Sequence, residues 1–243
     1  MKNHISLFIF AIALLSGPVS ANDLSMTAVK DTLASIPGEH NYIYVRTPLG
    51  EDEEKNYDEI TFYDGLGREL DFAQSYGADR AGAIMAHHHL IEYDSLGRKE
   101  KQWLSTNTSF SYMSPEDLKG GVLWDYHDAG KRSYLQTNYE SSPLNRITEQ
   151  YGVGDAWGDH PARMEYLTNI PADSLRCSFY FIDDNDSLIR RGDYRSGELQ
   201  VTKATDEDGK PTYTFVDKQG RTLLTRLGRG NQQADTYFVF DRF

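Results

Sequence analysis

The chain has 243 residues, of which 25 are lysine or arginine and 37 are aspartate or glutamate, giving a formal net charge of −12. This acidity argues against a nucleic-acid or anionic-membrane partner, because binding to such surfaces depends on a basic face. Hydrophobic residues make up 39% of the chain, and with glycine added this share is ordinary for a globular protein.

The first 21 residues have the features of a secretory signal peptide. Lys2 precedes an apolar run from Ile5 to Leu15 and a small-residue cleavage site at Val19-Ser20-Ala21. Their removal leaves 222 residues with 24 basic and 37 acidic side chains, a formal charge of −13. Asn22, not cysteine, then comes first, so we expect no lipid anchor, and no second apolar stretch approaches the roughly 18 residues of a membrane span. We expect an exported protein of the periplasm, the cell surface or the extracellular space.

Two short helices are predicted. The first covers Leu24 to Leu33, before the stop signal Ile36-Pro37-Gly38. The second starts from Ser114 as N-cap, with Pro115 at the first helical position, and runs toward Trp124 to His127. Neither is long enough to form a helical layer.

The rest of the chain has an all-β pattern. Runs rich in Tyr, Phe, Thr, Val and Ile are broken by Asp and Gly every 10 to 15 residues, and period-2 alternation places Leu70, Phe72 and Tyr76 on one face. The clearest predicted strands are Glu59–Tyr63, Glu69–Tyr76, His89–Tyr93, Phe179–Ile182, Lys210–Val216, Thr222–Leu227 and Thr236–Phe240.

An internal repeat is the strongest signal in the sequence. Residues 60–70 align with residues 90–100 at a constant offset of 30, and both contain the unit aromatic-Asp-x-x-Gly-Arg. The two full copies contain Tyr63, Asp64, Gly67, Arg68 and Tyr93, Asp94, Gly97, Arg98. Looser copies are Asp217-Gly220-Arg221, Asp206-Gly209-Lys210, Phe240-Asp241-Arg242 and the degenerate stretch Tyr139 to Arg146, with Asn145 in place of glycine.

Each unit predicts a β-hairpin. The aspartate ends one strand and accepts hydrogen bonds from the N–H groups of the turn, while the glycine three residues later takes the positive φ that a tight turn requires. Leu66 and Leu96 are expected to cover their turns, and the stem of the arginine is expected to lie over an aromatic ring. Single hairpins are marginal, so the repeats must stack into a sheet.

The two full copies resemble the YD repeat of RHS (rearrangement hotspot) proteins. Asn41 to Leu49 and Ser141 to Ile147, followed by Glu149-Gln150, further resemble an uncharacterised domain that precedes the RHS repeats in proteins exported by Bacteroidetes-type bacteria. The resemblance covers residues 40 to 243. It implies an antiparallel sheet of stacked hairpins, part of an open β-shell, and it carries no known catalytic residues.

On this basis we divide the chain into four segments. They are a signal peptide at 1–21, a linker at 22–38, an RHS-associated β domain at 39–150 and a YD-repeat-like sheet segment at 151–243. The chain ends at Asp241-Arg242-Phe243, where the next residue of the unit should be glycine, so we expect a truncated or split gene product, or a remainder supplied by another chain. An unfinished last strand exposes an edge that invites strand addition, for which a downstream RHS-repeat chain is the expected partner.

Histidines and acids offer the most conspicuous candidates for a metal site. His87 and His89 share a face if they lie in a strand, and His127 or His160 could complete a zinc site. The preferred interpretation is a polar loop that leads into the strand at Leu90. The run from Asp183 to Ser187 resembles a calcium loop but lacks its glycine and its final glutamate, which favours an acidic β-turn. We predict no metal and no cofactor.

No catalytic constellation is found. Cys177 has no local histidine, so a buried cysteine is preferred over a nucleophile. Gly152-Val153-Gly154 favours a turn against a packed Trp157. Trp103 and Trp124, like Trp157, could stack on sugars but are expected to be core or turn-covering residues.

Two functions remain open from the sequence. The first is a non-enzymatic structural and interaction module, part of an RHS/YD-repeat shell or cell-surface array. The second is a carbohydrate-binding or carbohydrate-active module of the cell envelope, with an aromatic platform and an acidic pair.

Overall fold

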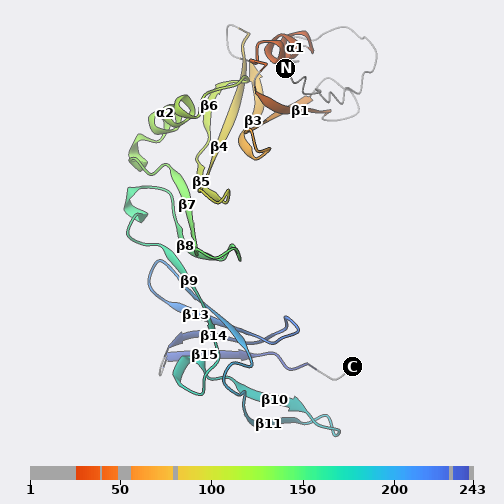
Figure 1. Ribbon diagram of the computed structural model, residues 1–243, viewed down its shortest axis with the longest axis vertical. Helices are drawn as coiled ribbons and strands as arrows, with labels where there is room; N and C mark the ends of the chain where they lie inside the picture. Colours follow the sequence, from red (N-terminus) through yellow and green to blue (C-terminus); the bar gives the residue numbers. More distant parts are fainter. Residues whose placement is uncertain (1–25, 39, 49–55, 79–81, 230–231, 241–243) are drawn as a thin grey trace. The chain divides into compact units, whose positions relative to one another are not determined.

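The computed structural model describes residues 26–38, 40–48, 56–78, 82–229 and 232–240. The predicted signal peptide and the stretch Asp241-Arg242-Phe243 lie outside these residues. The chain forms two compact units, one that runs to Gln136 and includes Val153–Asp155, and one made of Thr137–Gly152 and the residues from Ala156 onward. The boundary passes through strand β7 (Tyr134–Tyr139) (Figure 1).

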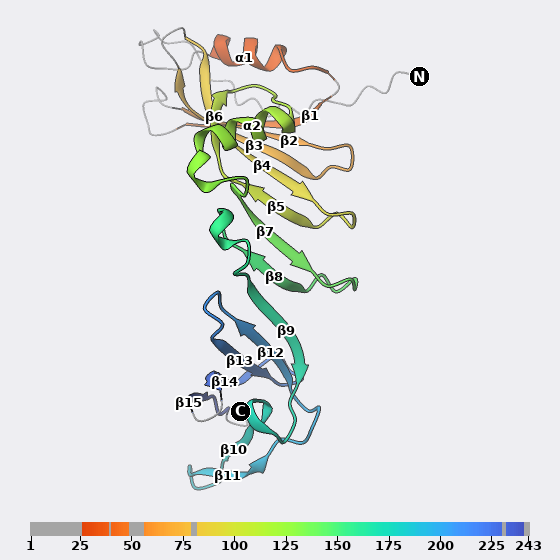
Figure 2. The ribbon, with the colours of Figure 1, turned by 90° about the vertical axis from the view of Figure 1, so that its left-hand side faces the viewer.

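The first unit is an antiparallel sheet with two short α-helices, which Figure 2 shows against its strands. The strands lie in the order β1-β2-β3-β4-β5-β7, and β6 pairs with the first half of β4. The elements are α1 (Met26–Ala34), β1 (Asn41–Pro48), β2 (Asn56–Tyr63), β3 (Glu69–Ala78), β4 (Ile84–Tyr93), β5 (Lys99–Trp103), β6 (Thr106–Ser109), α2 (Pro115–Asp125) and the 3-10 turn η1 (His127–Ala129).

Alternation along β2 and β4 builds the core of this unit. Ile60 and Phe62 of β2 are buried, as are Ile84 and Ala86 of β4, while the residues between them are half-buried. Helix α1 adds Val29 to this cluster. Because side chains alternate across a strand, one face of the sheet is covered while the other stays accessible.

A buried ion pair fixes the edge strand β1. Asp58 of β2 accepts hydrogen bonds from Arg46 Nε at 2.7 Å, from Arg46 Nη2 at 2.9 Å and from the Tyr44 hydroxyl at 2.6 Å. Burial and the Asp58 carboxylate together raise the pKa of Tyr44, so the phenol stays protonated and donates. A buried carboxylate without these donors would be strongly destabilising, so the pair fixes the register of β1 on β2.

Helix α2 begins and ends close to its predicted limits. The Ser114 hydroxyl accepts a hydrogen bond from the N–H of Asp117, and Pro115 takes the first helical position. Leu118 and Val122 are its buried residues. Helix α1 likewise confirms the first prediction within two residues at its start and one at its end.

The second unit contains further antiparallel strands and a separate two-stranded hairpin. Its strands follow the order β8-β9-β12-β13-β14-β15, and β10 pairs with β11. Its core contains Val201, Phe215 and Leu224, with Cys177 and Leu199 beside them. The elements are β8 (Ile147–Tyr151), β9 (Ala162–Thr168), η3 (Asp173–Leu175), β10 (Ser178–Ile182), β11 (Leu188–Asp193), β12 (Gln200–Thr205), β13 (Pro211–Val216), β14 (Thr222–Arg229) and β15 (Gln232–Tyr237), with η2 (Asp155–Trp157) at the unit boundary.

The all-β prediction is confirmed, with two corrections. The strand predicted at His89–Tyr93 starts at Ile84, so the histidines lie inside β4 and not in a loop. The last strand, predicted at Thr236–Phe240, covers Gln232–Tyr237 instead. Among the described residues, no helix is long and apolar enough to cross a membrane.

Candidate functional site: the hairpin turns and an aromatic cleft

The first repeat turn is closed by its aspartate. Asp64 accepts hydrogen bonds through Oδ1 from the N–H groups of Leu66 and Arg68, each at 2.9 Å, and through Oδ2 from Arg68 Nε at 2.7 Å. The N–H of Asp64 donates to the carbonyl of Arg68 at 2.9 Å, and the N–H of Gly67 donates to the carbonyl of Asp64 at 3.0 Å. Gly67 has a φ of 76°, the left-handed conformation that suits glycine.

The second turn repeats the same bonds at the same lengths. Asp94 accepts from the N–H groups of Leu96 and Arg98 at 2.9 Å and from Arg98 Nε at 2.7 Å, and Gly97 has a φ of 82°. The turn from Asp217 to Arg221 in the second unit differs by no more than 0.1 Å in the three corresponding side-chain bonds. One local sequence therefore produces one turn geometry in both units.

These contacts lower the pKa of the turn aspartates. Burial acts to raise the pKa of Asp64, Asp94 and Asp217, but the backbone N–H groups and the guanidinium of each turn outweigh it. The carboxylate form is the one that all these donors stabilise.

Three further turns follow the pattern with other residues. Asp206 accepts from the N–H groups of Asp208 and Lys210, although the Lys210 ammonium binds Asp208 and not Asp206. In the degenerate copy, Asn145 takes the left-handed conformation with φ 55°, and Arg146 pairs with Glu140 at 2.9 Å. This turn is longer than the repeat turns, since the N–H of Glu140 donates to the carbonyl of Arg146 at 2.9 Å.

The former calcium-loop candidate is the third of these turns. Asp183 accepts from the N–H groups of Asn185 and Ser187 at 2.9 and 2.8 Å, and Asp186 holds the left-handed position with φ 59°. This is the acidic β-turn that the sequence favoured. Its similarity to the repeat turns was not detected from the sequence, because Asp186 replaces the glycine and Ser187 replaces the arginine.

The arginine of the first turn also contacts the neighbouring hairpin. The guanidinium of Arg68 lies over the ring of Tyr93, with its carbon 4.5 Å from the ring centroid. The Tyr93 hydroxyl donates to the carbonyl of Glu69 at 2.7 Å. The register of β3 and β4 pairs Asp71 with Leu90, and its continuation brings Arg68 opposite Tyr93. The predicted cover of an aromatic ring by the arginine is confirmed.

The same contact recurs twice in the second unit. Arg146 lies over Tyr166 at 4.9 Å, and the Tyr166 hydroxyl donates to the carbonyl of Ile147 at 3.0 Å. Arg221 lies over Phe240 at 5.1 Å. Continued registers of β8 with β9 and of β14 with β15 again place each arginine opposite its ring.

The arginine thus joins two hairpins. It binds the acidic residue of its own turn and covers an aromatic ring on the strand that returns to the same end of the sheet. Sequence reasoning missed Tyr166, because no aspartate follows it; only the register identifies it. Leu66 and Leu96 do not cover their turns as expected, since 79% and 64% of their surfaces stay exposed.

The three histidines of β4 alternate between its faces. His88 is buried, with Nδ1 2.6 Å from Asp71 Oδ2 and Nε2 2.9 Å from the carbonyl oxygen of Ser109. A carbonyl only accepts, so Nε2 carries a proton. His87 and His89 share the other face, where His87 stacks on Tyr76 and His89 lies near Phe72. Among the described residues no group of three or more metal-ligating side chains comes together.

The cysteine and the three tryptophans singled out in the sequence show no sign of a catalytic role among the described residues. Cys177 is buried, and desolvation raises its pKa to about 12, so the thiolate of a nucleophile is disfavoured. Trp157 packs its ring against Gly152, as predicted. Trp103 contacts Tyr134, whereas Trp124 is 83% exposed and belongs to no core.

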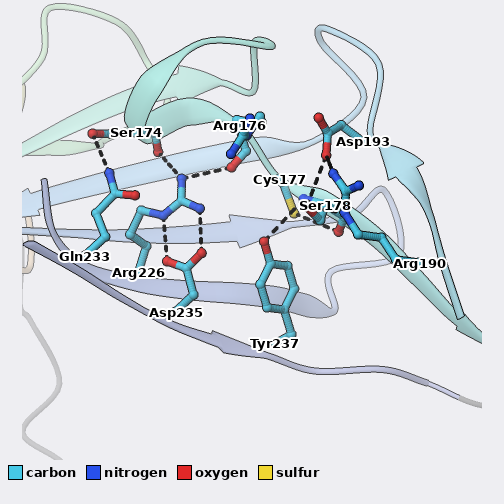
Figure 3. Close-up of polar contacts among 10 residues, drawn as sticks. All are labelled: Ser174, Arg176, Cys177, Ser178, Arg190, Asp193, Arg226, Gln233, Asp235 and Tyr237. Carbon is cyan, nitrogen blue, oxygen red and sulfur yellow. Dashed lines mark hydrogen bonds and ion pairs between the residues drawn. The ribbon is translucent and has the colours of Figure 1, made fainter. Parts of the chain in front are cut away.

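A buried arginine anchors the β10 segment to strand β14 (Figure 3). Arg226 of β14 binds both carboxylate oxygens of Asp235 on β15 at 2.7 Å. Its Nη1 donates to the carbonyls of Ser174 and Arg176, each at 2.9 Å. Each nitrogen of this guanidinium binds an acceptor on β15 or on the segment before β10, so the start of β10 is held on the sheet.

Beside this anchor lies a cleft of about 260 Å³. One wall comes from β10, with Phe179 and Tyr180, and the other from Tyr237 and the residues that follow it, including Phe238. Tyr180 and Tyr237 meet edge to face at 4.8 Å. Aromatic rings and two arginines, Arg191 and Arg221, line this hollow together.

The fold and these turns define a β-sheet protein built from repeated hairpins. The chain belongs to the family described as a domain of unknown function (DUF6443), whose profile matches residues 41–168, just over half of the chain. The matched residues include the turns at Asp64, Asp94 and Arg146. Searches of curated proteins and of solved structures found no match.

Replacing Gly67 or Gly97 by valine should lower the free energy of unfolding by about 1 kcal/mol or more, because a β-branched residue is strained at positive φ. At Gly97 a Cβ would also lie 3.1 Å from Arg68 Nη1 and disturb its cover of Tyr93. Gly65→Ala is the matched control, since Gly65 has no positive φ and nothing within 4 Å. Urea titrations that show equal stability for all three variants would mean that the turn assignment is wrong.

Asp94→Asn should destabilise the protein by about 1 kcal/mol near pH 6, and the difference from wild type should shrink on acidification. The pKa of Asp94 is lowered below 3.8 in the folded state, so its contribution is present above the unfolded value and is lost as the pH falls through the folded value. Urea titrations at pH 6 and pH 2.5 measure this. A difference that stays the same at both pH values would contradict the account.

The double substitution of His87 and His89 by alanine should leave stability nearly unchanged, whereas His88→Ala should cost about 3 kcal/mol, because it leaves the buried Asp71 carboxylate unpaired. Thermal melts with and without zinc compare the variants. A zinc-dependent rise in Tm that the double variant abolishes would overturn the assignment of His87 and His89 as structural residues.

Proposed function

We propose that the chain is an exported, non-enzymatic structural and interaction module of the RHS/YD-repeat type, which forms part of a β-shell or a cell-surface array. The observation that carries this proposal is the opposed arginine–aromatic contact between successive hairpins, found at Arg68, Arg146 and Arg221. A contact that recurs at the same register position in both units is typical of a repeat protein, in which each unit is stabilised by its neighbour.

The turn chemistry supports a scaffold. In the full copies the acid, the glycine and the arginine are all engaged in closing the turn or covering the next ring. These residues are therefore committed to holding hairpins together. A chain with this arrangement can add hairpins of the same kind at the end of its sheet.

Strand β15 offers a place for such an addition. Among the described strands it pairs with β14 alone. The N–H of Phe238 donates to the carbonyl of Leu223 on the β14 side, so by alternation the N–H of Gln233 points away from β14. An outward row of backbone groups on an edge strand is the site at which partner strands bind.

Binding of a hairpin peptide tests this role. The probe is a synthetic peptide of residues 56–78, which carries one complete repeat turn, added to the immobilised full chain. Gln233→Pro removes one outward N–H, and Gln233→Ala is the matched control that keeps it. We expect saturable binding to wild type and to the alanine variant, and at least a tenfold loss for the proline variant. Equal binding by all three proteins, or none, would refute strand addition at β15.

Export is tested separately by expressing the full chain with a C-terminal tag in a Gram-negative host. We expect the tagged protein outside the cytoplasm with an N-terminus at Asn22. An unprocessed chain in the cytoplasmic fraction would contradict the proposed localisation.

A further inference from the structure

The cleft beside β10 differs in charge from the rest of the chain. Its lining residues include Arg191 and Arg221 and no aspartate or glutamate, although the chain carries a net charge of −12. A lining guanidinium without a carboxylate partner attracts an anionic group at short range, where local charges outweigh the screened field of distant ones.

The two arginines have different surroundings. Arg221 is occupied, since it binds Asp217 and covers Phe240. Arg191 is exposed and has no hydrogen bond or ion pair within the described part of the chain. Its sequence neighbour Arg190, by contrast, binds Asp193 at 2.7 Å, as Figure 3 shows. Arg191 is therefore the guanidinium that a ligand can engage.

Arg191 lies at an irregularity in the backbone of β11. The register of β10 with β11 pairs Tyr180 with Arg190 and then Phe179 with Gly192, so Arg191 is the extra residue of a β-bulge. Gly192 has a φ of 119°, outside the range that other residues adopt readily. Bulges redirect a side chain away from the regular alternation of a strand, and this one directs Arg191 toward the cleft that it lines.

We propose that this cleft binds an acidic saccharide, a sugar ring that carries a carboxylate. The ring's C–H face would lie on the aromatic walls formed by Phe179, Tyr180 and Phe238. The carboxylate would bind the fork of Arg191, which suits it in shape and charge. The hydroxyl of Tyr194, which also lines the cleft, suits the hydroxyls of a sugar.

Size and rigidity favour a short sugar over a polypeptide segment. About 260 Å³ lies below the roughly 300–1,000 Å³ of sites that enclose drug-sized ligands, so the cleft holds one or two units of a longer sugar chain. The Arg226 anchor and the Tyr237 hydroxyl, which accepts from the N–H of Ser178 at 3.3 Å, hold the walls in place. A pre-formed site of this kind binds without the cost of ordering loops.

Calorimetric titration of the full chain tests the inference, with α-1,4-linked trigalacturonate as the probe. The neutral probe α-1,4-galactotriose and a hexaglutamate peptide serve as comparisons. We expect saturable binding of trigalacturonate at low salt, at least tenfold tighter than that of either comparison. No binding of trigalacturonate, or equal binding of the neutral sugar or the acidic peptide, would overturn the proposal.

Variants locate the site. Arg191→Ala should weaken trigalacturonate binding at least tenfold, and Tyr180→Ala should weaken it while Tyr180→Phe retains it. Arg190→Ala is the matched control, because it removes an equal charge from a residue that does not line the cleft. Circular dichroism melts confirm that each variant is folded. Equal losses at Arg190 and Arg191 would mean a diffuse charge effect and not this site. Neither result bears on strand addition at β15, which Gln233→Pro tests on its own.

Discussion

The arginine of the Asp-x-x-Gly-Arg turn is the residue on which neighbouring hairpins depend. Within its own turn, Arg68 satisfies the Asp64 carboxylate, and across the next strand it covers the ring of Tyr93. The first contact fixes the turn, and the second fixes where the following hairpin lies, because an arginine can cover an opposite ring only in one register. Isolated hairpins are marginal in water, so this coupling between neighbours is what lets short strands build a large sheet.

Away from the turns, the strands are stabilised by buried side chains and by ion pairs at the outer strands β1 and β15. Arg46 on β1 binds Asp58 on β2, and Asp235 on β15 binds Arg226 on β14, each pair bidentate and largely buried. Breaking one partner of such a pair leaves an uncompensated buried charge, whereas an unpaired edge of plain polar residues can slip in register. The edges are therefore defined as firmly as the core, which suits a protein whose proposed partners bind at an edge.

Much of this fold could be predicted from the sequence, since the conformation of each turn is determined by residues next to one another in the chain. The Asp-x-x-Gly-Arg unit specifies a hairpin wherever it occurs, and Ser114-Pro115 specifies a helix start. Other features depend on residues distant in the chain. Asp186 adopts the left-handed conformation that glycine takes in the other turns. Tyr166 is the ring that Arg146 covers although no aspartate follows it, and it is recognised only from the pairing of the strands. Likewise Arg191 has no sequence signal, because its place as the extra residue of a bulge depends on the pairing of β11 with β10.

The coupling between Arg68 and Tyr93 tests the central claim most directly. A double-mutant cycle with Arg68→Ala, Tyr93→Leu and the combined variant, followed by urea unfolding, isolates the interaction between the two hairpins from the cost of each change. The account predicts a favourable coupling of about 1 kcal/mol between these residues. Additive effects, with a coupling of less than about 0.3 kcal/mol, would contradict it and would mean that the hairpins stack without help from the arginine.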